Sequence, residues 1–138
     1  MEQRLMSPPA AALARDSADQ HFSDPALIPQ FQHCIEACLQ CFESCEQMMV
    51  HLSTKENVDP NLIRLLNDAV EITQVSATFM LRGSNFHIRT CAVCAEVCKV
   101  CAEALNKIAS SAADELIKSC VTALKDCSQS CDQMAHHH

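Results

Sequence analysis

Residues 91–101 read CAVCAEVCKVC, and residues 34–45 read CIEACLQCFESC. In both stretches the cysteines stand three or four residues apart, which is the spacing that places side chains on one face of an α-helix. A third stretch nearer the C-terminus repeats the pattern with Cys120, Cys127 and Cys131. We therefore expect three helices whose inward faces carry thiols where Leu or Ile usually packs.

Capping residues mark the ends of the second expected helix. Asp59 predicts an N-cap, and Pro60 suits the first helical position because its missing N–H is not needed there. Gly83 is the one glycine in the chain, and it predicts a helix end at Arg82, where a residue at positive φ is favoured. Ser84 then predicts the cap of the third helix.

The other boundaries follow from turn-forming stretches. The first helix is expected to end at Leu52, before the polar residues 53–57, and Ser111 with Asp114 resembles a capping box for the fourth. Short connections make consecutive helices antiparallel neighbours. The fold class is therefore all-α, an antiparallel up-down-up-down four-helix bundle over residues 29–135. Residues 1–28 are interpreted as an N-terminal arm or short helix, and His136, His137 and His138 as a purification-tag remnant.

Charge and composition restrict the function. The net charge is −7, which disfavours nucleic acid and anionic membranes as partners. Residues 1–20 contain no apolar run like that of a secretory signal, so a cytoplasmic protein is expected. Reducing cytosol disfavours structural disulfides, which directs the interpretation of 11 cysteines toward metal binding or redox chemistry. No catalytic constellation is evident, so the sequence does not predict an enzyme.

A soft metal ion fits the aligned thiols best. Cu(I) takes two or three thiolates and tolerates bridging sulfur, so we expect several Cu(I) ions per chain. Zinc is the alternative metal, and a thiol redox protein or a purely structural oligomerisation bundle are the alternative functions. The candidate metal ligands are Cys34, Cys38, Cys41, Cys45, Cys91, Cys94, Cys98, Cys101, Cys120, Cys127 and Cys131.

The two ends of the expected bundle differ in chemistry. One end should gather soft, exchangeable ligands beside the thiols, and we interpret it as the entry mouth for the metal. Its candidate ligands are His33, Met80, His87 and Met134. The other end should form a dry apolar plug of Leu52, Leu62, Leu65, Leu66, Leu105, Ile108 and Leu116.

With these features in place, the sequence resembles the bacterial four-helix-bundle copper storage proteins over roughly residues 30–134. The resemblance rests on HCIEACLQC at 33–41, FMLRGS at 79–84 and CAVCAEVCKVC at 91–101. It implies a bundle interior that binds many Cu(I) ions, His and Met ligands at the open end, a homo-tetramer and a cytosolic location. The chain departs from that family in its second helix, where Ala69 and Thr73 stand at core positions that relatives give to cysteine. That departure implies a smaller capacity.

Overall fold

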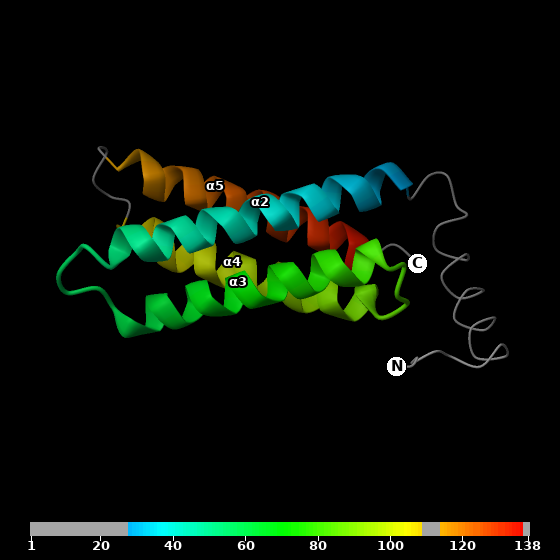
Figure 1. Ribbon diagram of the computed structural model, residues 1–138, viewed down its shortest axis with the longest axis horizontal. Coiled ribbons are helices and arrows are strands. Elements are labelled where there is room, and N and C mark those ends of the chain that lie inside the picture. Colours follow the sequence, from blue (N-terminus) through cyan, green and yellow to red (C-terminus); the bar gives the residue numbers. More distant parts are fainter. Residues whose placement is uncertain (1–27, 109–113, 137–138) are drawn as a thin grey trace, which may run out of the picture.

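The computed structural model describes residues 28–108 and 114–136, and these residues form four α-helices. Their bounds are α2 (Ile28–Leu52), α3 (Pro60–Leu81), α4 (His87–Ile108) and α5 (Glu115–Ala135). Both α2 and α4 pack against α3 and α5, so the helices occupy the four corners of a bundle with antiparallel neighbours (Figure 1). The predicted up-down-up-down bundle is confirmed. Residues 1–27 of the expected N-terminal arm (1–28) lie outside the described residues, as do Ser111, His137 and His138, and Ile28 is the first residue of α2.

The ends of α3 follow the sequence prediction closely. The Asp59 side chain accepts a hydrogen bond from the Asn61 N–H at 3.0 Å, and Pro60 is the first helical residue. At the other end Gly83 has a φ of 67°, a conformation that costs glycine little. The Ser84 N–H bonds to the Phe79 carbonyl and the Gly83 N–H to the Met80 carbonyl, which is the Schellman pattern.

Two predicted caps differ from the structure. Ser84 Oγ accepts from the Phe86 N–H at 3.1 Å, but this bond closes a turn, and α4 begins only at His87. Asp114 was expected as the distal member of a capping box, and it is instead the N-cap of α5, accepting from the Ile117 N–H at 3.2 Å. Ser and Asp both suit the cap position, so residue type alone did not decide which of them the chain would use.

The core follows the bundle axis and is sulfur-rich in its middle. At one end it is closed by the apolar side chains of Met48, Leu52, Leu62, Leu66, Leu105 and Ile117, all buried. The predicted plug is wrong at Ile108 and Leu116, which are 44% and 37% exposed, and Leu65 is only half-buried. Ile117 shares its helix face with Val121 and Leu124, three to four residues apart, so its neighbour Leu116 must point outward.

In the described part of the chain, none of the helices combines the length and the hydropathy that a membrane span requires.

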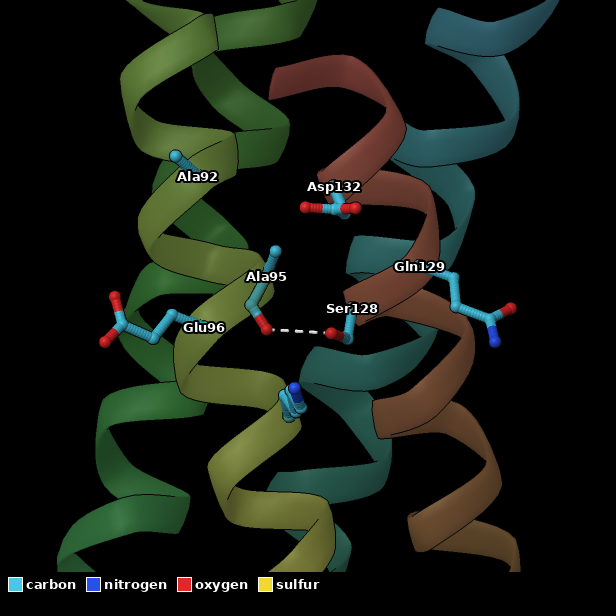
Figure 2. Close-up of a pocket in the computed structure, with 7 residues that line it drawn as sticks. Ala92, Ala95, Glu96, Ser128, Gln129 and Asp132 are labelled. Carbon is cyan, nitrogen blue, oxygen red and sulfur yellow. Dashed lines mark hydrogen bonds between the residues drawn. The ribbon is translucent and has the colours of Figure 1, made fainter. Parts of the chain in front are cut away.

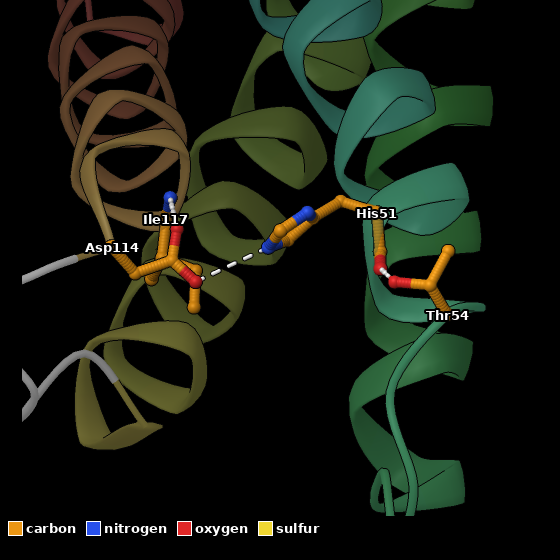
Figure 3. Close-up of polar contacts among 4 residues, drawn as sticks. All are labelled: His51, Thr54, Asp114 and Ile117. Atoms are coloured by element: carbon orange, nitrogen blue, oxygen red, sulfur yellow. Dashed lines mark hydrogen bonds and ion pairs between the residues drawn. The ribbon is translucent and has the colours of Figure 1, made fainter.

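A polar contact joins the C-terminus of α2 to the N-terminus of α5 (Figure 3). His51 Nε2 lies 3.1 Å from Asp114 Oδ2, and both side chains are about three-quarters buried (26% and 21% exposed). The hydrogen bond from His51 lowers the pKa of the Asp114 carboxyl, and the bond from the Ile117 N–H lowers it further. The ionised carboxylate therefore stabilises the folded state at neutral pH.

Replacing Asp114 with asparagine tests this contact. Asparagine is also a good N-cap, so the change removes mainly the charge. The carboxyl has a lower pKa in the folded state, so its contribution is present above the unfolded pKa near 3.8 and is lost as the pH falls through the folded value. Thermal unfolding followed by circular dichroism should give Asp114→Asn a slightly lower Tm at pH 7 and an unchanged Tm in strong acid. The exposed control Glu46→Gln should show neither change, and a deficit that is constant with pH would contradict the argument.

Candidate metal centre

All 11 cysteines are buried free thiols, none more than 1% exposed. They come from α2, α4 and α5, and the three stripes meet along the bundle axis, as their spacing predicted. The fourth wall carries no thiol, because residues 60–81 contain no cysteine. Ala69 and Thr73 are fully buried there, and the Thr73 hydroxyl donates to the Ala69 carbonyl at 2.7 Å. The thiols therefore line three sides of the interior.

Thiols from different helices are in van der Waals contact. The Sγ of Cys131 on α5 lies 3.6 Å from that of Cys34 and 3.5 Å from that of Cys38, both on α2. Cys127 Sγ lies 3.7 Å from Cys38 Sγ and 3.8 Å from Cys94 Sγ on α4. These separations far exceed the S–S bond length of about 2.05 Å, so the sulfurs are neighbours without being cystines.

Three overlapping groups of thiols could each hold a metal ion. In each group all the sulfur atoms lie within 4.8 Å of one another: Cys38, Cys94, Cys127 and Cys131; Cys34, Cys91 and Cys131; and Cys41, Cys98 and Cys127. Cys131 belongs to the first and second groups, and Cys127 to the first and third. The groups therefore form one continuous set of eight thiols, which we call the thiol chain.

The remaining three cysteines lie toward the apolar plug. Cys45 Sγ is 4.0 Å from Cys41 Sγ, and Cys120 donates its S–H to the Ser44 carbonyl at 3.7 Å. Cys101 belongs to none of the three groups. On α5 the fully buried Leu124 takes the helical step between Cys120 and Cys127, so sulfur is interrupted there. The plug side of the core is therefore poorer in sulfur.

Hydrogen bonds between neighbouring thiols shift the pKa values of the cysteines in the thiol chain. The pKa of Cys94 is lowered, first by its hydrogen bond with Cys127, because neighbouring S–H groups stabilise its thiolate. The pKa of Cys131 is raised by hydrogen bonding, first with Cys127 and then with Cys34, and burial raises that of Cys101. Metal binding requires thiolates. An ion that enters the thiol chain must therefore displace protons.

Three of the four soft ligands predicted for the entry mouth are buried at the end of the core opposite the apolar plug. Met80, His87 and Met134 are each at most 2% exposed, and the carbonyl of Ser84 lies 2.9 Å from His87 Nδ1. A carbonyl can only accept, so Nδ1 is the donor in this contact. The His87 ring packs against Phe31, with 4.9 Å between the ring centroids. This end is therefore covered by an aromatic side chain.

The structure places Phe31, and not His33, on the inward face at the start of α2. His33 was grouped with the entry ligands, but its side chain is exposed in a shallow surface groove with Glu36 and Asp126. It precedes Cys34 by one residue, which rotates it by about 100° away from the cysteine face. Phe31 was overlooked, although it precedes Cys34 by three residues and so continues the same face.

A side-chain hydrogen bond joins α4 and α5 next to the thiols. Figure 2 shows a groove on this side lined by Ala92, Ala95, Glu96, Lys99, Ser128, Gln129 and Asp132. Ser128 Oγ donates to the Ala95 carbonyl at 2.8 Å across it. Each of these two residues directly follows a thiol of the thiol chain, Cys127 and Cys94 respectively. The hydrogen bond therefore fixes the register that brings those sulfurs together.

Comparisons with known proteins agree with this arrangement. A family model described as copper storage protein matches residues 25–138. The crystal structure of a protein from Nitrosospira multiformis is 34% identical with a TM-score of 0.69, and the match covers 78% of this chain and 95% of that one. The Cu(I)-bound copper storage protein BsCsp3 is 26% identical with a TM-score of 0.69, covering 77% and 98%. The uncharacterized cysteine-rich protein YhjQ of Bacillus subtilis (strain 168) is 32% identical over an alignment of 108 residues, and the match covers 74% of this chain and 93% of the relative.

Proposed function

The chain belongs to the copper storage protein family, and from this we propose that it stores or buffers several Cu(I) ions on its core thiols. The observation that supports the proposal most directly is the overlap of three metal-competent thiol groups. The proposed ligands are the 11 cysteines already named, with the thiol chain as the main store. The proposed role is that of a non-enzymatic cytoplasmic metal store.

The chemistry of Cu(I) suits the shared sulfurs. Cu(I) is soft and binds two or three thiolates, and the second and third groups each supply three. A buried ion surrounded by several thiolates leaves an excess of negative charge, which is costly in a low-dielectric interior. When Cys127 and Cys131 each bridge ions in two groups, fewer thiolates are needed per ion and the excess charge falls. Bridging therefore favours loading with several ions.

We propose the Phe31 end as the route by which copper enters. Met80, His87 and Met134 lie there, and thioether and imidazole groups are exchangeable ligands that could pass an ion to Cys34 or Cys91. The opposite end is closed by a plug in which Met48 supplies one thioether and the other buried side chains named above are aliphatic. Phe31 would have to move for an ion to pass, because it packs on His87.

We also propose that the chain is a homo-oligomer, with a tetramer as the expected state. Ile72, Val75, Val93 and Val97 line a groove between α3 and α4, and Val75 and Val93 are 40% and 48% exposed. An apolar strip of this kind is the sort of surface that contacts between copies cover. Light scattering on the apo-protein tests this state, and the mass of a single chain would rule it out.

Titration of the reduced apo-protein with Cu(I), under anaerobic conditions and against a competing chelator, tests the store. We expect several ions to bind per chain, with weaker binding at lower pH because uptake releases protons. Uptake of one ion or none would overturn the proposal. Protein purified from copper-supplemented and zinc-supplemented cells distinguishes a copper store from a zinc protein by its metal content. Reversible loss of free thiols under a mild oxidant would instead indicate redox chemistry.

A further inference from the structure

We propose that Cys38, Cys94, Cys127 and Cys131 form a ready-made tetrahedral site for one thiophilic divalent cation, with Zn²⁺ as the fitting ion. The site uses thiols of the copper store but does not depend on Cu(I) binding. Its distinguishing feature is that four sulfurs, and not three, all lie within 4.8 Å of one another. Four-sulfur tetrahedra are typical of Zn²⁺, whereas Cu(I) takes fewer thiolates.

The sulfur separations match the size of such a tetrahedron. A Zn–S bond of about 2.3 Å gives an S–S edge of about 3.8 Å in a regular tetrahedron. The Cys38–Cys131, Cys38–Cys127 and Cys94–Cys127 separations are 3.5, 3.7 and 3.8 Å. The other three edges lie within 4.8 Å. Small side-chain adjustments are therefore enough to close the four sulfurs around an ion.

The backbone already holds these thiols in place. Cys38 is on α2, Cys94 on α4, and Cys127 and Cys131 occupy adjacent turns of α5. All four are fully buried in mid-helix positions. The zinc sites that sequence motifs predict lie in turns, so spacing along one helix does not reveal a site that three helices assemble. The packing of three helices assembles the site. The ligand side chains are therefore already close together before an ion binds.

Neighbouring thiols can balance the charge of a filled site. Four thiolates around a divalent ion carry a net charge of −2, which needs hydrogen-bond donors when buried. Cys34 Sγ lies 3.6 Å from Cys131 Sγ, and Cys98 Sγ lies 3.8 Å from Cys127 Sγ and 3.9 Å from Cys94 Sγ. Held as S–H groups, these two thiols can donate one hydrogen bond each, from Cys34 to Cys131 and from Cys98 to Cys127.

The shared sulfurs also limit the first filling to one ion per chain. Once Cys127 and Cys131 are bound to this ion, the second group retains only Cys34 and Cys91 as unshared thiols, and the third only Cys41 and Cys98. Two thiols do not complete a tetrahedron. The first divalent ion should therefore bind at this site alone.

Titration of the reduced, metal-free chain with Co²⁺ under anaerobic conditions tests the site, because tetrahedral Co²⁺–thiolate centres have intense visible and charge-transfer bands. We expect these bands to saturate at one Co²⁺ per chain and to disappear when one equivalent of Zn²⁺ is added. Cys94→Ser and Cys38→Ser should each weaken Co²⁺ binding by at least about 100-fold, because each removes a ligand. Cys101→Ser is a matched control on α4, equally buried but outside the site, and it should bind Co²⁺ like the parent chain.

Three results would overturn the inference: no tetrahedral bands in the parent chain, bands that persist in both ligand variants, or bands that are lost equally in Cys101→Ser. Circular dichroism of each variant separates the loss of a ligand from the loss of the fold. Cu(I) titration of the same preparations keeps the two proposals apart. Copper uptake without the Co²⁺ bands contradicts the divalent site alone, and the bands without copper uptake contradict the copper store alone.

Discussion

Replacing Cys127 and Cys131 together with serine should remove more than half of the Cu(I) capacity of the chain. Every one of the three metal-competent groups contains at least one of these two thiols. The double variant therefore leaves only two thiols in each of the three groups, so no group can supply three thiolates to one Cu(I) ion. Cu(I) titration against a competing chelator measures both the number of copper sites that remain in the variant and their affinity.

The matched control is the double variant Cys101→Ser/Cys120→Ser. It also removes two buried thiols, one from α5 and one from α4, but neither thiol belongs to any of the three groups. Its capacity should fall only in proportion to the sulfur lost, roughly a fifth for two thiols of 11. Equal losses in the two double variants would show that copper binds to the thiols without regard to their grouping.

Replacing Phe31 with alanine should destabilise the apo-protein and speed the removal of bound copper. Phe31 is 2% exposed, and truncating a buried phenylalanine costs about 3 to 5 kcal/mol. If copper leaves through this end, the lost packing also lowers the free energy of local opening. Extraction of Cu(I) by a strong chelator should then be at least about tenfold faster. Urea unfolding measures the first effect, and stopped-flow chelation measures the second.

Leu66→Ala provides the control at the opposite end. Leu66 is fully buried in the apolar plug, and its truncation should cost a comparable 2 to 5 kcal/mol or so. Extraction of copper from this variant should remain close to the parent rate, because the change is far from the Phe31 end. Equal acceleration in both variants would mean that copper leaves by general loosening of the bundle and that no single end serves as its route.

The proposed copper store and the proposed divalent site use the same sulfurs, so we expect the two metals to compete. The first divalent ion would occupy Cys127 and Cys131, which are the same sulfurs that connect the three groups for Cu(I). A bound Zn²⁺ would therefore block copper loading until it is displaced. Soft thiolates favour Cu(I) over Zn²⁺, so copper should remove the zinc. The absence of cysteine at Ala69 and Thr73 leaves the middle of α3 without thiol ligands for either metal.

The sequence alone determined which helices form and which of their faces turn inward. A spacing of three and four residues places Cys91, Cys94 and Cys98 on one helix face whatever the neighbours do, because 3.6 residues per turn is a property of the backbone. The caps at Asp59 and Gly83 were equally local and were confirmed. Local rules were less decisive where two similar residues competed, as with Ser111 and Asp114 at the start of α5.

Only the tertiary structure decided which sulfurs share an ion. Periodicity gives the rotation of a residue about its own helix, but the axial offset between helices is set by packing, as in the Ser128–Ala95 hydrogen bond. That offset places Cys127 and Cys131 at the junctions between groups. It also places Phe31 over His87, a contact between helices that no spacing within one helix can encode. The pattern of cysteines thus determined a thiol-lined bundle, and the register between its helices decided where metal can bind.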